Sequence, residues 1–491
     1  MQVIEAVNVV LSVDRGFSSG QSMNTTLLAP AQWAQMEFGL AELGDQRRTN
    51  RLVNIAEGLA KSPGGTLPQA FRAWDDLKGA YRFFNQAENS YEQILAAHWQ
   101  RTRAACREAG EYLLIEDTTE LDYTHHPATM EMGSIGDGRG RGLWLHSTLA
   151  VRVEGWNLDQ RPEGVVLGLF GQQCWSRRGP ARRGRETWRE RVKRPRESQR
   201  WAAVLEEVSP PPHGSRWIYI ADREADFYEP VQRCQRSGID FIIRGYRDRV
   251  LADGAGDLKN TVGQAPVLGQ MTVAVRSRGG EPARTAIVEV RSVTGVWLKG
   301  PWRPGGERPD FPVNVVEVRE VDAPPWVKEP LYWLLLTSLP CTRWAEVRRI
   351  IGRYTARWWV EEFHKALKTG TRVEDSQMER AYKVESLVAV LGVVAVRLLN
   401  AKWLARTRPN ELVDAQVFGP AALAILAGMF GQPKGGWTHG SALVAVARVG
   451  GFLARRHDGS PGWQTIWRGW QRLMWMCDGV EALNLTKKRC G

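Results

Sequence analysis

Two short apolar segments that each end at an aspartate constrain the fold of this chain more than any other feature. The segment YLLIE, residues 112–116, has the length and composition of a buried strand, and Asp117 follows it. The segment RWIYIAD, residues 216–222, predicts a second buried strand that ends at Asp222. The sequence therefore predicts a sheet with acidic side chains at the ends of two of its strands.

The segments around these two strands predict an α/β domain. Residues 143–154 and 163–175 have the pattern of two strands joined as a hairpin. A helix is expected between Asp222 and a further strand at 241–245. Residues from about 246 to 330 alternate with a period of two, which predicts a β-rich insertion.

The regions on either side of this α/β domain are predicted to be helical. We expect a flexible extension at 1–28, in which Met23 is an alternative start, and a helical domain at 29–95. The α/β domain is placed at 96–371, and a second helical domain at 372–491. In the first helical domain a helix is expected directly after Asp45, a residue type that caps helix N-termini.

The charge of the chain favours a polyanionic partner. There are 66 Lys and Arg residues against 54 Asp and Glu residues, a net charge of +12, and nucleic acid is the most common partner of such a chain. A membrane surface is the other candidate, but the longest apolar run, 387–396, is shorter than the roughly 20 residues that span a bilayer. The six cysteines form no CxxC pair, and no signal peptide is evident, so a cytoplasmic protein is expected.

A third acid, Glu361, lies in the segment YTARWWVEEFHKALKTG, residues 354–370. At roughly 100° per residue, Tyr354, Arg357, Glu361 and Lys368 fall on one stripe of a helix, about 21 Å long. The opposite side is apolar, so the segment predicts an amphipathic helix. Taken alone, such a polar stripe is usually a solvated face.

Asp117, Asp222 and Glu361 together suggest a metal site. Three converging carboxylates repel one another, and a hard cation with oxygen ligands, Mg²⁺ or Mn²⁺, compensates them well. Two such ions about 3.5–4 Å apart can activate the nucleophile and stabilise the leaving oxygen in phosphodiester chemistry. A ribonuclease-H-like fold gathers three carboxylates at one edge of a mixed sheet in this way. The chain has no phosphate-binding Walker loop, which argues against nucleotide hydrolysis.

These motifs resemble those of one enzyme family. The spacing Y-(2)-R-(3)-E-(6)-K of Tyr354, Arg357, Glu361 and Lys368 is similar to the signature of DDE cut-and-paste transposases of bacterial insertion sequences. The segments IEDTTELDY and IADREADFYE resemble the two Asp motifs of that family, and LGDQRRTNRLVNIAEGLAK resembles its N-terminal end-binding domain. The resemblance extends from about residue 30 to residue 485.

The resemblance implies a ribonuclease-H-like catalytic core that contains Asp117, Asp222 and Glu361 as metal ligands. The flanking helical domains would bind transposon ends and mediate dimerisation. The enzyme would cut the element at its terminal inverted repeats through a hairpin intermediate and join the 3′-ends to target DNA. A homodimer would hold the two ends together in a paired-end complex.

The resemblance also assigns DNA contacts. It implies that Trp333 stacks on a flipped base and that Arg244 lies near the scissile phosphate, with the phosphates beside the acids held by Tyr354, Arg357 and Lys368. In the N-terminal helical domain, base-specific recognition is expected near the start of the first long helix, at Arg47, Arg48 and Arg51. The basic segment 181–200 is expected to contact the DNA backbone.

Two other functions remain open from the residues. A metal-dependent nuclease or resolvase would use the same acids without strand transfer. A non-catalytic DNA-binding protein, such as a repressor, would keep only the helical N-terminal domain. Trp333 also has a structural interpretation as part of a core strand.

Overall fold

The computed structural model describes most of the chain. The described residues are 28–490, except for 178–196, 253, 255, 276–280, 304 and 414–417. All but the last residue of the expected flexible extension (1–28) and most of the basic segment (181–200) therefore lie outside the described residues.

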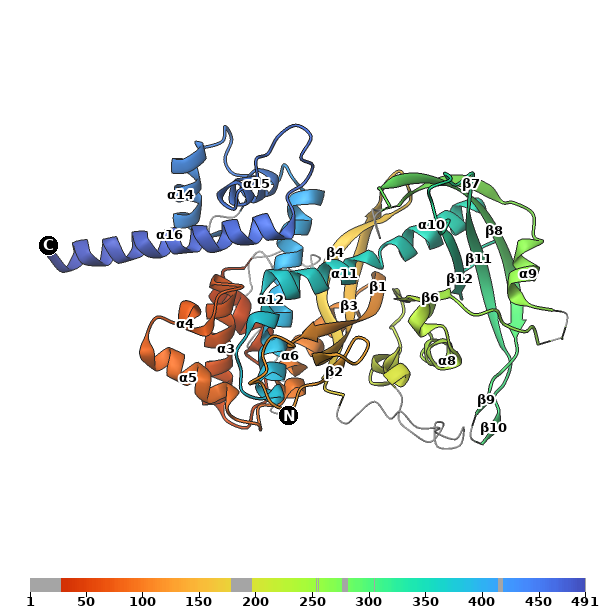
Figure 1. The fold of residues 1–491 in the computed structure, drawn as a ribbon, viewed down its shortest axis with the longest axis horizontal. Helices are drawn as coiled ribbons and strands as arrows, with labels where there is room; N and C mark the ends of the chain where they lie inside the picture. The colour runs from red at the N-terminus through yellow and green to blue at the C-terminus, as the bar shows by residue number, and fades with distance from the viewer. Residues whose placement is uncertain are drawn as a thin grey trace.

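The N-terminal region is helical, as expected. The helices are α2 (Pro30–Phe38), α3 (Gln46–Lys61), α4 (Leu67–Ala70), α5 (Trp74–Phe84) and α6 (Tyr91–Ala105). The side chain of Asp45 accepts a hydrogen bond from the main-chain N of Arg47 at 2.8 Å, so Asp45 is the predicted N-cap of α3. The apolar face of α3 packs into the core through Leu52, Ile55 and Leu59. These helices lie beside α12 in Figure 1.

A mixed sheet follows. Its first strands, β1 (Gly110–Asp122), β3 (Gly140–Trp156) and β4 (Pro162–Trp175), are antiparallel neighbours. On the other side of β1, the strands β5 (Ser215–Ala221) and β6 (Asp240–Gly245) run parallel to it and to each other. All five strands predicted for this region, two of them as the hairpin, are therefore confirmed.

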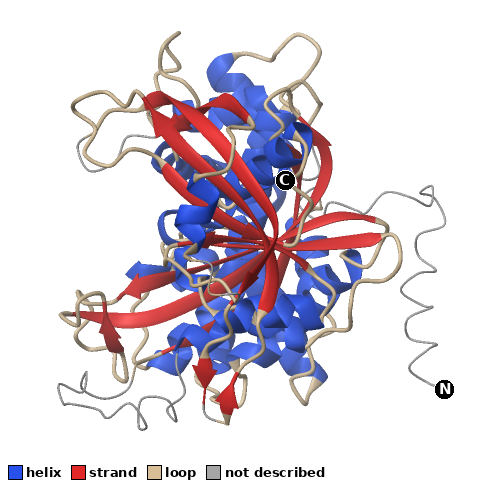
Figure 2. Cartoon of the chain, turned by 90° about the vertical axis from the view of Figure 1, so that its right-hand side faces the viewer, coloured by secondary structure: helices blue, strands red, loops and turns tan. Residues whose placement is uncertain are grey.

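The β-rich insertion extends the same sheet. Its strands are β7 (Gly269–Val275), β8 (Arg284–Leu298) and β11 (Phe311–Val321), and β12 (Tyr332–Thr337) joins them to β6. The ten-stranded sheet has the order β2-β3-β1-β5-β6-β12-β11-β8-β7, with β4 on β3 and β2 at Gly133–Ile135. A separate small hairpin consists of β9 (Trp302–Arg303) and β10 (Gly306–Glu307). The strands fan around a common centre in Figure 2, which is the twist expected of a long sheet.

Short helices connect the strands. They are η2 (Glu197–Arg200), η3 (Ala203–Glu206), η4 (Arg223–Ala225), α8 (Tyr228–Arg236) and α9 (Leu258–Gly263). The sequence after Pro195 predicts one helix that extends to about residue 208, but η2 and η3 are two separate 3₁₀ turns. Ala202 between them has a left-handed backbone, with φ of 57°, and its main-chain N donates to the buried Glu116 at 2.7 Å. This contact breaks the helix.

The segment predicted as one continuous helix is divided into three parts. They are the end of α10 (Trp344–Thr355), α11 (Trp358–Lys365) and a π-helical turn, η5 (Ala366–Gly370). At the joint, the main-chain N atoms of Ala356 and Arg357 donate to carbonyls three residues earlier, both at 3.0 Å, which is tighter winding than that of an α-helix.

The expectation of a single polar stripe along 354–370 is therefore wrong. A tight turn before α11 and a wide turn after it change the rotation per residue, so the four signature residues do not share one exposed face. Tyr354 is 5% exposed and packs in the core. The opposite, apolar side is buried as predicted, through Val360, Phe363 and Leu367.

The C-terminal region is helical. Its helices are α12 (Ala381–Thr407), α14 (Pro420–Phe430), α15 (His439–Val449) and α16 (Trp463–Cys490), preceded by the short η6 (Val373–Asp375). Helix α12 is long and apolar enough to cross a membrane, but 78% of its apolar window is buried inside the protein. It packs against α6, α15 and β4, so it is a core helix.

The two faces of the sheet have separate cores. One face packs against the N-terminal helices and α10 to α12, through residues such as Ile115, Leu335 and Val388. The other face packs against η3, α8 and α9, through residues such as Tyr219 and Phe241. Helix α11 is held against the first face, next to β1 and β3.

Candidate active site

The register of the sheet brings the two aspartates together. Strands β1 and β5 are parallel, and Ile115 is paired with Ile220. Continuing both strands by two residues places Asp117 beside Asp222, with both side chains on the face that α11 covers. Asp117 lies within β1 and not at its end, because β1 continues to Asp122 through its pairing with β3. Asp222 follows β5 and caps η4 by accepting a hydrogen bond from Glu224 N at 2.8 Å.

Arg357 joins the third acid to this pair. Its Nη1 lies 3.3 Å from Asp117 Oδ2, and its Nη2 lies 2.5 Å from Glu361 Oε1. Arg357 is the N-cap of α11 and Glu361 is four residues further on, so both side chains point to the same side of the helix. The side chains of Asp117, Arg357 and Glu361 are mostly buried.

The electrostatics of the site show that the acids act on one another. Burial raises the pKa of Asp117 to about 7, and repulsion from Asp222 and Glu361 adds to this effect against the opposing charge of Arg357. Burial alone would lower the pKa of Arg357, but Tyr354 and the three acids outweigh it and raise that pKa. The cluster is therefore one acidic centre in which Arg357 pairs directly with two of the three acids.

The donor chemistry of this centre fits a hard divalent cation, because all three acidic side chains offer carboxylate oxygens. Their spacing is set by Arg357, which lies between Asp117 and Glu361. In the described part of the chain, no three His, Cys, Asp or Glu side chains are arranged to hold a metal ion.

An aromatic pair lies next to the acids. The rings of Trp333, on β12, and Tyr354, on α10, meet edge to face with centroids 5.2 Å apart. Arg244, on β6, donates to the carbonyl of Tyr332 at 3.1 Å and also hydrogen-bonds the Tyr354 hydroxyl. In this structure Tyr354 supports Trp333 and Arg244 from within the core and presents no exposed hydroxyl.

The fourth signature residue, Lys368, is separated from this cluster. It lies on the π-helical turn, and its Nζ is 3.5 Å from Glu374 Oε1. Its charge also contributes to lowering the pKa of Asp122, after the hydrogen bonds that Thr124 donates to that carboxylate. Lys368 therefore faces the far end of β1.

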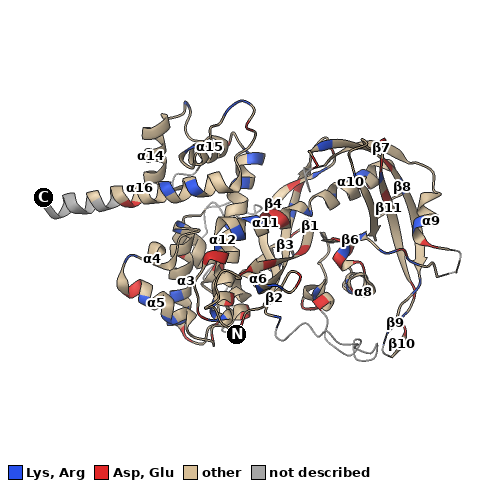
Figure 3. Ribbon diagram, viewed as in Figure 1, with Lys and Arg blue, Asp and Glu red and all other residues tan. Residues whose placement is uncertain are grey.

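Two of the three arginines predicted to contact DNA at the start of α3 have internal partners. Arg48 Nη2 is 2.9 Å from Glu88 Oε2, and Arg51 Nη1 is 3.1 Å from Asp76 Oδ1. Acidic and basic positions lie together on α3 and α5 in Figure 3. The positive charge near this helix N-terminus is thus balanced in part by the protein itself, and Arg47 makes no ion pair with a described residue.

A buried acid next to Asp117 escaped the sequence prediction. Glu116 accepts hydrogen bonds from Thr148 Oγ1 at 2.9 Å, from Ala202 N at 2.7 Å and from the Tyr219 hydroxyl. Burial would raise its pKa, but His146 and the hydrogen bonds outweigh it, so the pKa is lowered. Glu116 fixes β1 to its surroundings at the position before Asp117. In the sequence, the signal for Glu116 is a charged residue at the end of the apolar run of a predicted strand.

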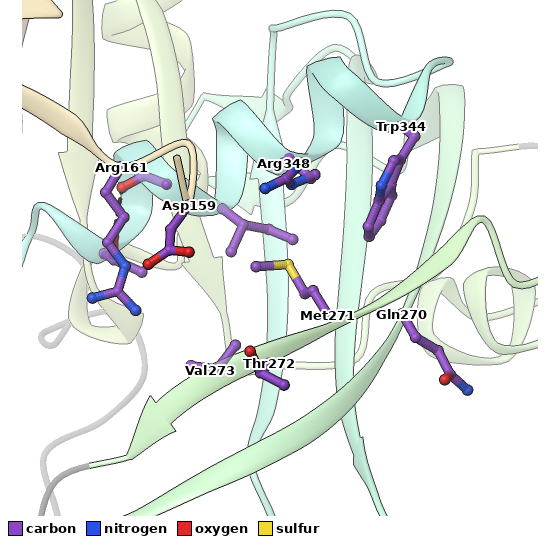
Figure 4. A pocket seen from close by; sticks show the side chains of 11 residues that line it. Asp159, Arg161, Gln270, Met271, Thr272, Val273, Trp344 and Arg348 are labelled. Atoms are coloured by element: carbon purple, nitrogen blue, oxygen red, sulfur yellow. Dashed lines mark hydrogen bonds between the residues drawn. The ribbon is translucent and has the colours of Figure 1, made fainter. Parts of the chain in front are cut away.

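A separate cavity of about 250 Å³ lies between α10 and β7 (Figure 4). Its lining includes Trp344, Arg348, Met271 and Arg161. Neither the three acids nor Arg357 line it, so it is not part of the candidate active site.

Residues 30–88 match the sequence family described as transposase DNA-binding. The match extends from the first residue of α2 into the segment between α5 and α6, and it includes the three arginines of α3. It supports a transposase, a class of enzyme that cuts and joins DNA, and it supports DNA as the partner of this chain. A helical DNA-binding region thus precedes a mixed α/β sheet that carries the acidic centre.

Proposed function

We propose that this chain is a DDE-type transposase that cuts its element out of DNA and joins it to a target. The observation that carries the proposal is the cluster of Asp117, Asp222 and Glu361 around Arg357, in a chain whose residues 30–88 match a transposase DNA-binding family. The three acids come from β1, from the end of β5 and from α11, so only the folded sheet brings them together.

The arrangement of the sheet supports a ribonuclease-H-like core. Three antiparallel strands, β1, β3 and β4, are followed by two parallel strands, β5 and β6, on the other side of β1. The acids lie at the edge where β1 passes beyond β5, and α11 crosses this edge. Strand β12, which follows the β-rich insertion, supplies Trp333 next to the same edge.

Asp117, Asp222 and Glu361 would hold two Mg²⁺ or Mn²⁺ ions. Bound there, the ions would supply an activated nucleophile and stabilise the leaving oxygen. The chain itself would hold the DNA: Arg357 and Arg244 provide positive charge near the acids, and Lys368 provides it at the far end of β1. Trp333 offers an aromatic ring beside them for a base flipped out of the transposon end.

One strand would be cut at the element's end, and the freed 3′-hydroxyl would attack the opposite strand to give a hairpin. Water would then open the hairpin, and attack of the 3′-ends on target DNA would complete the reaction. Both ends must be held together, which implies a homodimer in a paired-end complex. Exposed apolar residues on α16, including Trp475 at 53% and Leu483 at 66%, support a contact through the C-terminal helices.

The test is incubation of the purified chain with its flanking inverted repeats, Mg²⁺ and a target plasmid. A transposase gives hairpin ends, released element and joined products. A nuclease or resolvase gives cleavage without joining, and a repressor gives binding alone. Asp117→Ala is the control, because it should abolish cleavage while end binding persists. Cleavage by that variant would refute the assignment of the acids.

A further inference from the structure

An exposed aromatic side chain lies at the same edge of the sheet as the acids and has no role in the proposal above. Tyr246 is the first residue after β6, and 65% of its surface is exposed. Single exposed aromatic residues are common on protein surfaces. Tyr246 differs because the protein fixes its main chain from several sides.

A buried carboxylate organises the segment that carries Tyr246. Asp226, which is 4% exposed, accepts hydrogen bonds at Oδ2 from the main-chain N of Tyr246 at 2.7 Å and of Arg247 at 2.8 Å. Its Oδ1 accepts from Arg249 Nε at 3.2 Å. Lys259 Nζ donates to the carbonyl of Tyr246 at 3.2 Å. The main chain at Tyr246 is held on both sides, so the point from which the exposed ring extends is defined.

The sheet register places this ring beside the candidate active site. In the antiparallel pair of β6 and β12, Arg244 is opposite Leu335 and Gly245 is opposite Leu334. One further step along this register brings Tyr246 opposite Trp333. From the other side, the guanidinium of Arg223, the residue after Asp222, lies 5.7 Å from the centre of the Tyr246 ring.

We propose that Tyr246 is a stacking platform for an unpaired nucleobase of the DNA strand that is processed at the acids. This inference rests on the proposed function and extends it, since Trp333 alone was assigned to base stacking. An exposed ring accepts any base on its face, and the nearby cations Arg223, Arg247 and Lys259 balance the phosphates on either side. Because the main chain at Tyr246 is already fixed, only its two side-chain torsions lose freedom when a base stacks on the ring.

The experiment measures binding of the full chain to two fluorescent single strands without divalent cations. One strand carries bases, and the other has the same length and is abasic. Tyr246→Ala is compared with Tyr246→Trp, which keeps an aromatic face. Trp297→Ala is the matched control: Trp297 is 54% exposed, and its cross-strand partner is Pro312, far along β11 from Val318, which pairs with Trp333.

Tyr246→Ala should weaken binding of the base-bearing strand about tenfold and leave the abasic strand unchanged. Tyr246→Trp should bind both strands as the unaltered chain does, and so should Trp297→Ala. The inference would be overturned if Tyr246→Ala bound the base-bearing strand as tightly as the unaltered chain does. It would also be overturned if the variant lost the same affinity for both strands. Because this assay needs no cleavage, its result is independent of whether the chain cuts its terminal repeats in Mg²⁺.

Discussion

Asp117→Asn should stabilise the metal-free protein while abolishing cleavage. The pKa of Asp117 is raised to about 7 from an ordinary value of 3.8, mainly by burial. Each pKa unit corresponds to about 1.36 kcal/mol, so holding this carboxylate ionised in the folded chain costs about 4 kcal/mol. Asparagine removes that charge. The attraction of Arg357 is already included in this pKa, so a gain of up to about 4 kcal/mol is expected.

The pH dependence follows from the same shift. Because the folded pKa is raised, the contribution of Asp117 to stability is fully present below about pH 4 and is lost as the pH rises through about 7. The advantage of Asp117→Asn should therefore be largest at pH 8 and disappear near pH 4. Mg²⁺ should reduce the stability difference between the variant and the unaltered chain at pH 8, because a cation bound by the acids favours the ionised form of Asp117.

Thermal unfolding of both proteins at pH 4 and pH 8, with EDTA or Mg²⁺, measures these differences. The expected result is a melting temperature several degrees higher for the variant at pH 8 with EDTA. Ser147→Ala, opposite Asp117 on β3, is a control that removes a buried hydrogen bond from Gln172 and leaves the charge of the site intact. An unchanged or lower melting temperature for Asp117→Asn at pH 8 would refute the view that the ionised carboxylate of Asp117 destabilises the folded protein.

Three further predictions follow. Arg357→Ala should lower the free energy of unfolding by about 2 kcal/mol or more in EDTA, because it leaves buried acids unpaired. Mg²⁺ should restore part of this loss, and unfolding measured with and without Mg²⁺ checks it. Lys368→Ala should impair DNA-end processing but change stability by only about 0.5 kcal/mol, as measured by end cleavage and thermal unfolding. A fragment of residues 24–95 should prefer the terminal repeat over random duplex, and Arg47→Ala should reduce that preference more than Arg48→Ala does; competition binding decides both.

Much of the fold could be predicted from the sequence, because it depends on local patterns. The strands β3 to β6 were expected from short apolar runs, and α3 from its cap at Asp45 and its apolar face. The sequence could not show that the β-rich insertion continues the same sheet, since pairing of β12 with β6 is a contact between distant segments. It also could not show the interruption before α11, where two residues keep helical dihedrals but change hydrogen-bond partners.

The candidate site was predictable as a set of residue types but not as a set of contacts. Asp117, Asp222 and Glu361 could be chosen because each stands next to, or on, an element with a clear apolar pattern. The partners of Arg48 and Arg51 could not be predicted, because Glu88 and Asp76 belong to other segments and only the fold brings them near. Tyr246 gave no sequence signal, since its fixed position depends on Asp226 twenty residues earlier.

The structure gives Arg357 a second role beside the one expected from its motif. The motif assigns it to DNA phosphate, whereas the structure pairs it with Asp117 and Glu361. A guanidinium that pairs with both acids offers less positive charge to a phosphate, so the two roles would follow in order. Without a cation, Arg357 is the only positive group that touches both acids among the described residues, and it keeps them together in spite of their repulsion. A cation held by the acids would replace that charge and free Arg357 for an incoming phosphate. We infer that cation binding and DNA binding reinforce each other through this residue.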